Sequence, residues 1–185
     1  MMRSVRGLAL LLICLSPVGC AGEVISTSSE GRSGMDMQEA ADRADSILDS
    51  ALNEIQPKVN WAHGITTTGS CDVSRRRAVM TSISPERRGS FLGLMDRHWR
   101  KSGYRIKAVN NSAELPAIYA QTDEGFGVSL RFGGQGQAFF QVDSPCVDKS
   151  EVAESTTPPN GPAYEGVYPL PRPNIRSPFW SAGAP

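Results

Sequence analysis

The chain contains two segments with helical periodicity. The first precedes two strand-like runs and the second separates these from four more, and this order restricts the possible folds. Residues 37–55 repeat apolar side chains at spacings of four and three, as in an amphipathic helix. Asp36 and Glu39 have capping-box spacing at its start, and Pro57 marks its end. Ser84-Pro85-Glu86 predicts a second helix start, and Gly103 suits a left-handed helix end.

Six runs rich in β-branched and aromatic residues are expected to form strands. Two of them, 61–68 and 77–84, lie between the helices and would pair as a hairpin. The other four are 104–109, 117–122, 126–132 and 137–142, and the last three indicate a meander joined by short glycine-containing turns. The order αββαββββ predicts an α+β two-layer sandwich, in which an antiparallel sheet of five to six strands carries both helices on one face.

The first part of the chain has the layout of a secretory signal. Arg3 and Arg6 precede an apolar run, 8–15, that is much shorter than the ~20 residues needed to span a bilayer. The stretch Ser16-Pro17-Val18-Gly19-Cys20 resembles the lipobox of bacterial lipoproteins, although Pro17 stands where that family usually has Leu. The resemblance implies a signal peptide over 1–19, acylation (palmitate) of Cys20 and anchoring at the outer face of the cell membrane. The alternative, cleavage after Gly22, would release a secreted protein.

The rest of the chain divides by composition. Residues 20–35 would form the lipid anchor and a flexible tether rich in Ser, Thr and Gly, and residues 36–147 the folded α+β domain. Residues 148–185 hold eight of the thirteen prolines and predict a Pro-rich disordered tail. Its aromatic residues leave open that it docks on the domain or on a partner; they are Tyr164, Tyr168, Phe179 and Trp180. High use of Gly, Pro and Arg indicates an actinobacterial type of envelope.

The four cysteines reduce to one expected disulfide. Cys14 would leave with the signal and Cys20 would carry lipid, so Cys71 and Cys146 remain. Two thiols in an oxidising compartment form one bond, which would join the loop after the first strand to the end of the last strand. The alternative is two buried free thiols. A redox role is not indicated because the chain has no Cys-x-x-Cys pair.

Charge is unevenly distributed although the net charge is zero. Residues 74–107 hold ten Lys and Arg against two acids, whereas residues 21–73 hold nine acids against three bases. One interpretation is a face that binds an anionic partner, and the other is neutralisation of a basic second helix by an acidic first helix. The candidate residues of the anionic-partner face are Arg75, Arg76, Arg77, Arg87, Arg88, Arg97, Arg100 and Lys101.

No motif in the sequence predicts catalysis. His63 and His98 have no His or Cys at metal-ligand spacing, the glycine-containing segments 69–71 and 133–136 match no nucleophile or phosphate-binding motif, and the acids of the first helix are expected on its exposed side. We therefore expect no catalytic, cofactor-binding or metal-binding residues, no enzyme and no nucleic-acid partner. The favoured function is a lipid-anchored envelope protein whose domain binds an envelope protein or anionic wall polymer. Alternatives are a small cell-wall hydrolase with an unrecognised site and a structural or inhibitor domain.

Overall fold

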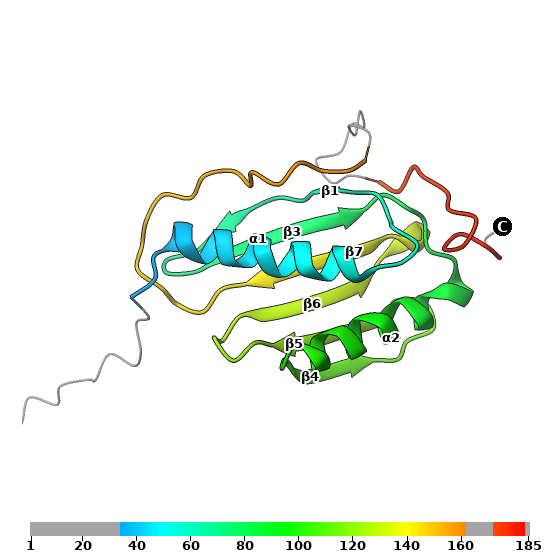
Figure 1. Cartoon of the computed structure of the whole chain (residues 1–185), viewed down its shortest axis with the longest axis horizontal. Helices are drawn as coiled ribbons and strands as arrows, with labels where there is room; N and C mark the ends of the chain where they lie inside the picture. Colours follow the sequence, from blue (N-terminus) through cyan, green and yellow to red (C-terminus); the bar gives the residue numbers. More distant parts are fainter. Residues whose placement is uncertain (1–33, 162–171, 184–185) are drawn as a thin grey trace, which may run out of the picture. The chain divides into compact units, whose positions relative to one another are not determined.

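The computed structural model describes residues 34–161 and 172–183. This part of the chain forms helices α1 (Met37–Glu54) and α2 (Pro85–Lys101) and a short 3-10 turn, η1 (Gly134–Gly136). Its strands are β1 (Trp61–His63), β2 (Thr67–Thr68), β3 (Val73–Val79), β4 (Arg105–Asn110), β5 (Ala117–Gln121), β6 (Gly127–Phe132) and β7 (Ala138–Asp143). The elements follow one another in the predicted order (Figure 1).

The strands form one antiparallel sheet in the order β1-β3-β7-β6-β5-β4, and β2 also pairs with β3. β1 and β2 lie end to end along β3, since Trp61 is opposite Val79 and Thr68 is opposite Val73. The expected strand 61–68 is therefore interrupted at 64–66, and its partner runs from 73 to 79 rather than from 77 to 84. β4 to β7 form a meander, which confirms the predicted pairing of its last three strands and adds β4.

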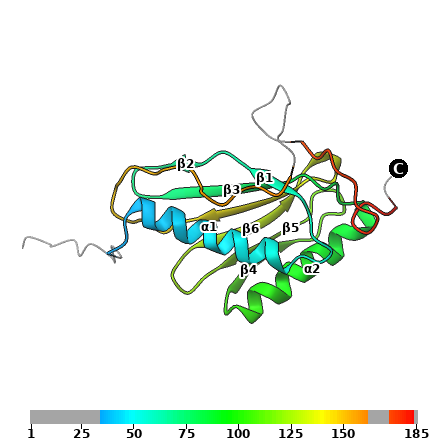
Figure 2. The same cartoon turned by 45° about the horizontal axis from the view of Figure 1, so that its top comes forward.

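Both helices cover the same face of the sheet (Figure 2). α1 packs on β3 and β7, and α2 packs on β4, β5 and β6. Because successive strand residues point to opposite faces, Leu130 and Phe140 are buried under the helices, whereas Arg131, Phe139 and Gln141 lie on the other face, which we call the open face. The predicted α+β two-layer arrangement is confirmed.

The helix ends follow the predicted chemistry closely. At α1 the Glu39 N–H donates to Asp36 Oδ1 at 2.9 Å and the Asp36 N–H donates to the Glu39 carboxylate at 3.0 Å, so the capping box is complete. α2 begins after Ser84 with Pro85 in its first turn, although the Ser84 hydroxyl makes no capping hydrogen bond. Gly103 follows its C-cap with a φ of +83°, a conformation that favours glycine.

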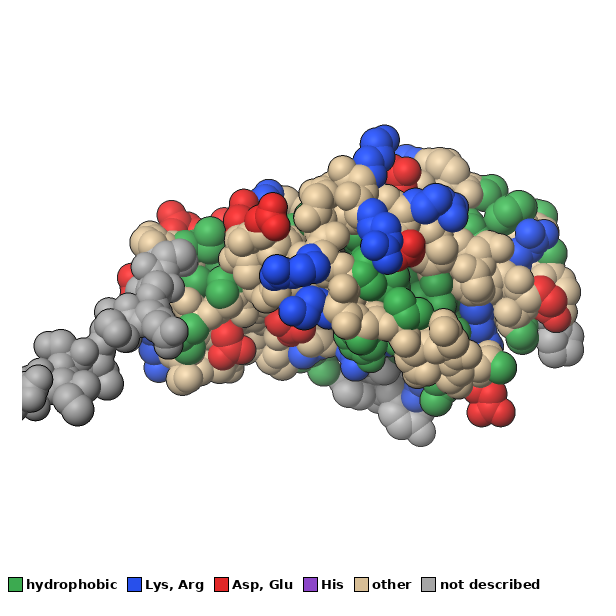
Figure 3. All heavy atoms as spheres, turned by 90° about the horizontal axis from the view of Figure 1, so that it is seen from below, with side chains coloured by type: hydrophobic (Ala, Val, Ile, Leu, Met, Phe, Trp, Pro, Cys, Tyr) green, Lys and Arg blue, Asp and Glu red, His purple; other side chains and the backbone are tan. Residues whose placement is uncertain are grey.

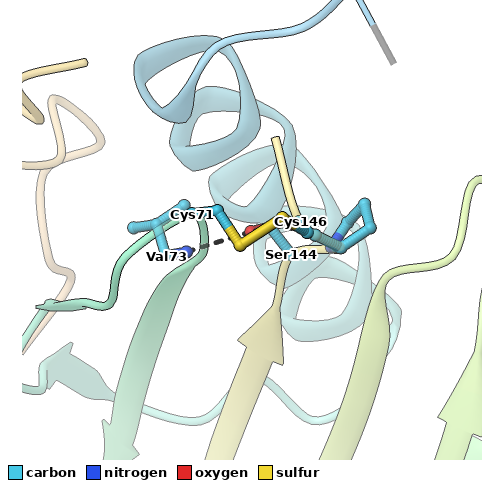
Figure 4. The surroundings of a disulfide bond; sticks show 5 residues. Cys71, Val73, Ser144 and Cys146 are labelled. Atoms are coloured by element: carbon cyan, nitrogen blue, oxygen red, sulfur yellow. Dashed lines mark hydrogen bonds between the residues drawn. A yellow bond between two sulfur atoms is a disulfide. The ribbon is translucent and has the colours of Figure 1, made fainter. Parts of the chain in front are cut away.

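Cys71 and Cys146 are joined in a disulfide, as predicted (Figure 4). The sheet register explains the match: Ser74 of β3 is opposite Asp143 of β7, so the two cysteines lie three residues beyond a paired position on neighbouring antiparallel strands. Beside the bond, the Val73 N–H donates to Ser144 Oγ at 3.0 Å. The disulfide therefore fastens together the ends of two strands that are already paired.

The prediction of a disordered tail is wrong for residues 148–161, which we call the strap. The strap follows α1 and then β1 and is drawn in orange in Figure 1. The Met37 N–H donates to the Asp148 carbonyl at 3.0 Å, and the Asn160 side chain accepts from the Trp61 N–H at 2.9 Å. Hydrogen bonds between the strap and these elements replace the sheet ladder that its prolines exclude.

The prediction is also wrong for residues 172–183, which pack on the domain. The Ser82 N–H donates to the Ile175 carbonyl at 2.9 Å, and the Ser84 N–H donates to the Trp180 carbonyl at 2.9 Å. The Trp180 ring is 2% exposed and meets Phe91 edge-on, with 5.0 Å between ring centroids. The buried indole supplies apolar area that the number of prolines in this segment did not indicate. Tyr164 and Tyr168 lie outside the described residues.

Candidate functional site

Three consecutive arginines of β3 point to alternating faces of the sheet. Arg75 and Arg77 point toward α1 and are 2% and 1% exposed, whereas Arg76 lies on the open face and is half-buried. The prediction that all three form part of an anionic-partner face is therefore wrong for Arg75 and Arg77. A count of charges along the sequence did not distinguish the two faces of a strand.

Asp45 of α1 lies between the two buried arginines. Its Oδ2 is 3.3 Å from Arg75 Nε, and its Oδ1 is 3.3 Å from Arg77 Nη2. Asp49, one helical turn further on, forms a second ion pair with Arg77. The expectation that the acids of this helix lie on its exposed side is thus wrong for Asp45, which is 8% exposed. Buried charges persist in proteins when they are paired in this way.

The strap covers this buried ion-pair cluster. Arg75 Nη2 donates to the Ala153 carbonyl at 2.6 Å, and Thr157 Oγ1 donates to Asp49 Oδ2 at 3.0 Å. The Arg77 guanidinium lies over the Trp61 ring at 4.1 Å from its centroid. The charges of Arg75 and Arg77 are satisfied inside the domain, so these residues stabilise the attachment of α1 and the strap to the sheet and are not available to a partner.

The exposed cations lie on α2 and the neighbouring edge strand β4. We call Arg97, Arg100, Lys101, Arg105 and Lys107 the basic surface; all five are exposed. Figure 3, which views the molecule from the side of α2 and β4, shows Lys and Arg side chains spaced among hydrophobic and acidic ones. Arg100 pairs with Asp96 at 3.0 Å. Arg97, Arg100 and Lys101 were predicted as part of the candidate face. Arg105 and Lys107 of β4 are added because β4 lies beside α2.

Arg87 and Arg88 lie in the first turns of α2 and contact other parts of the chain. The Arg87 guanidinium lies 4.3 Å from the centroid of the Phe179 ring, and Arg88 Nη1 donates to the Glu114 carbonyl at 2.7 Å. The eight residues predicted to form one face are thus distributed over the buried cluster, the open face, the start of α2 and the basic surface. Cys20, the predicted lipidation site, lies outside the described residues.

The two histidines have different surroundings. His63 Nε2 is 2.8 Å from the Thr157 carbonyl of the strap. His98 Nε2 is 3.3 Å from Ser50 Oγ, and His98 Nδ1 is 3.7 Å from a Glu54 oxygen, so these residues follow the order of a nucleophile, base and acid. Burial lowers the pKa of His98 below its usual value, against the opposing charge of Glu54.

The Ser50–His98–Glu54 contact lacks one element of an acyl-transfer site. Ser50 lies inside α1, where the neighbouring backbone N–H groups are hydrogen-bonded within the helix and do not converge on an oxyanion.

Among residues 34–161 and 172–183, no group of three or more His, Cys, Asp and Glu side chains is placed to hold a metal ion. In the same ranges, no helix has the length and apolar character of a membrane span.

Comparisons with known proteins show a weak similarity. No family model matches the chain, and no curated relative matches it. A solved structure of a DUF4853 family protein from Actinomyces odontolyticus ATCC 17982 is similar over 68% of this chain and 73% of its own, with 12% sequence identity and a TM-score of 0.33.

Proposed function

We propose that this chain is a lipid-anchored protein of the outer face of the cell membrane whose α+β domain binds an anionic partner and is not an enzyme. The leader and the lipobox-like segment support anchoring. The disulfide supports an oxidising compartment, because such bonds persist mainly outside the cytosol. The partner is an acidic protein surface or an anionic envelope polymer.

The basic surface is the observation that carries this proposal. Residues 96–107 hold five Lys and Arg against Asp96, a net charge of +4. Among the described residues, Arg97, Lys101 and Lys107 form no salt bridge, whereas the buried arginines of β3 are neutralised by α1. Exposed cations without acidic partners attract polyanions over a Debye length of about 8 Å at physiological salt. The cations that stabilise the fold are thus different residues from the exposed cations that we propose for binding.

Charge reversal on the basic surface tests the proposal. Full-length protein carrying Cys20→Ser, so that no acyl chain attaches it to the vesicles, is compared with and without Arg97→Glu, Lys101→Glu and Lys107→Glu. The measurements are sedimentation with phosphatidylcholine vesicles with and without phosphatidylglycerol, and capture of envelope components from native membranes. We expect binding to weaken at least about tenfold, at about 1 kcal/mol for each cation near an anionic surface. Salt should weaken the wild-type interaction in the same way.

A matched control reverses exposed lysines elsewhere. Lys58→Glu and Lys149→Glu change the charge outside the basic surface, at exposed positions. Binding by this control should stay close to that of wild type apart from the general change in net charge. Equal binding by wild type and the basic-surface variant, or binding that does not respond to salt, would rule out the basic surface as the binding site.

Anchoring is tested separately at Cys20. Wild-type protein should incorporate labelled palmitate and partition into the membrane fraction, whereas Cys20→Ser should lose the label and leave that fraction. Release of unacylated wild-type protein into the medium would favour the secreted alternative. A cytosolic protein with an intact leader would contradict both.

A small hydrolase is the second candidate, and the Ser50–His98–Glu54 contact is the observation that favours it. A fluorophosphonate probe, which labels activated serines, distinguishes the two functions. A binding protein should not react, because no oxyanion donors stand beside Ser50. Labelling that disappears in Ser50→Ala and in His98→Gln would establish the hydrolase.

A further inference from the structure

A cavity of about 380 Å³ opens on the open face, on the side of the sheet opposite the helices. Its lining includes Arg76 and Ala78 of β3, Arg131 of β6 and Phe139 of β7. The sheet register brings them together, because Phe139 is opposite both Ala78 and Arg131, and Gln141, two residues further along β7, is opposite Arg76. The cavity therefore sits on paired strands in the middle of the sheet, where the backbone is well held.

Two arginines of the cavity donate to the same neutral oxygen. Arg76 Nε donates to Gln141 Oε1 at 2.9 Å, and Arg131 Nη2 donates to that oxygen at 2.8 Å. Neither arginine forms a salt bridge with a described residue. Two positive charges that converge on one amide dipole repel each other, and an anion at the position of Oε1 would relieve that repulsion. Arg76 and Arg131 are thus arranged around a position that suits an anionic oxygen, but the oxygen at that position belongs to a neutral amide.

The surrounding polar groups hold the glutamine in place. Gln141 Nε2 donates to Asp143 Oδ1 at 2.6 Å, and Ser74 Oγ donates to the same oxygen at 2.5 Å. Asp143 therefore orients the amide so that its oxygen, and not its nitrogen, faces the two guanidinium groups. The carboxylate accepts from the amide nitrogen and forms no salt bridge with either arginine, while Arg76 Nη1 donates to the Ile65 carbonyl and to Thr67 Oγ1, each at 3.0 Å.

Apart from Arg77, the remaining residues that line the cavity are apolar: Gly64, Ala78, Phe132, Phe139 and Phe140. A Cβ atom at Gly133 would lie 2.9 Å from the Phe139 ring, so the glycine lets the ring lie against the backbone. A Cβ atom at Gly64 would lie 2.9 Å from Arg76 Cβ, so the backbone also approaches the arginine closely. A side chain at Gly133 would thus displace the Phe139 ring, and one at Gly64 would displace the base of the Arg76 side chain.

We propose that this cavity binds an oxyanion attached to an apolar group. Its carboxylate or phosphate oxygens displace the Gln141 amide oxygen between Arg76 and Arg131, and its apolar group lies against Phe139 and Ala78. Guanidinium groups match both oxyanions through paired N–H donors. This inference goes beyond the proposed function, because the cavity uses no residue of the basic surface and its ligand is a small oxyanion.

The test titrates full-length protein with three small probes and follows backbone amide shifts by NMR. N-acetylphenylalanine carries a carboxylate, N-acetylphenylalanine amide is its uncharged match, and phenyl phosphate carries the other oxyanion. We expect the acid or the phosphate to shift amides of β3, β6 and β7 in a saturable way, and the amide to bind at least about tenfold more weakly. The stronger of the two anions identifies whether the natural source is a carboxylate or a phosphate.

Variants localise the binding. Arg76→Gln and Arg131→Gln should each weaken the anion about tenfold or more, and Arg131→Lys should restore binding only in part because a lysine lacks the planar fork. Arg43→Gln is the matched control, since Arg43 also donates to a side-chain oxygen, that of Glu124, at 2.7 Å but lies outside both the cavity and the basic surface. Its affinity for the probes should equal that of wild type.

Gln141→Glu tests the mechanism directly. It places a carboxylate of the chain itself between the two arginines, so the folded variant should lose probe binding while keeping its amide dispersion and its binding to anionic vesicles. Absence of saturable binding by every probe, equal binding by the acid and its amide, or full binding by both arginine variants would overturn the inference. If the protein with an unchanged cavity binds the probes but does not bind anionic vesicles, that result would contradict the basic surface alone.

Discussion

The indole Nε1 of Trp180 donates a hydrogen bond of 2.6 Å to the carbonyl oxygen of Pro57, a residue 123 positions earlier in the chain. The ring is 2% exposed and packs edge-on against Phe91 of α2. The segment 172–183 thus contacts both the connection after α1 and the core side of α2. We therefore expect this segment to unfold together with the domain.

Removal of the indole should destabilise the whole domain. We expect Trp180→Ala to lower the free energy of unfolding by about 3–5 kcal/mol, because it removes a buried aromatic ring and leaves the Pro57 carbonyl without its donor. Urea unfolding followed by circular dichroism measures the change. Phe179→Ala is the control, since that ring is 39% exposed and its loss should cost far less. If Trp180→Ala lowers the free energy of unfolding as little as Phe179→Ala does, the segment does not belong to the folding unit.

Neutralising Asp45 should leave two buried guanidinium groups without their shared carboxylate. We expect Asp45→Asn to lower the free energy of unfolding by about 3–5 kcal/mol, as for a broken buried ion pair. The matched control is Asp96→Asn, which breaks the exposed pair with Arg100 and should cost about 0.3–0.5 kcal/mol. Urea titration of both variants decides, and a small effect at Asp45 would show that water reaches Arg75 and Arg77.

The disulfide should supply a large share of the stability. Cys71 and Cys146 close a loop of 75 residues, for which the chain-entropy model gives about 4 kcal/mol. We expect Cys71→Ser combined with Cys146→Ser to lower the free energy of unfolding by about that amount. Alkylation of native protein followed by mass spectrometry is the check on the bond itself, and modification of both cysteines without prior reduction would disprove it.

Stability should depend on pH through His98. Burial lowers the pKa of His98 below its ordinary value of about 6.5, so the unfolded chain takes up the proton before the folded chain does. The contribution of His98 is therefore present above pH 6.5 and is lost as the pH falls through its folded pKa. We expect the free energy of unfolding of wild type to fall more steeply below pH 6.5 than that of His98→Gln. Parallel curves for the two proteins would assign the acid sensitivity to carboxylates.

The sequence predicted the elements whose signals are local. Asp36 with Glu39, and Ser84 with Pro85, located both helix starts, because each pair lies within one turn of the helix start that it marks. Asp36 and Glu39 cap α1 by hydrogen bonds, whereas at α2 the signal is the position of Pro85 in the first turn. The two remaining cysteines predicted the disulfide without any knowledge of the sheet register. The α+β layering followed from the order of the elements.

The candidate site could not be predicted because it depends on contacts between distant residues. Arg75 and Arg76 are neighbours in the sequence, yet one pairs with Asp45 and the other with Gln141 on the opposite face. β3 begins at Val73, four residues earlier than the expected strand start at 77, so Arg75 and Arg76 both lie within the strand and their side chains point to opposite faces. Two sequence signals together could have revealed the burial of Arg75: side chains of a strand alternate between its two faces, and Asp45 and Asp49 lie four residues apart on one side of α1.

The disulfide lies close to the place where the chain from the N-terminal side joins the sheet. The Met37 N–H donates to the Asp148 carbonyl, two residues beyond Cys146. A tensile load applied at residue 34 therefore passes to residue 148 and, through the covalent bond at Cys146, to the start of β3. The disulfide would thus distribute a load that reaches residue 148 over the ends of β3 and β7 together.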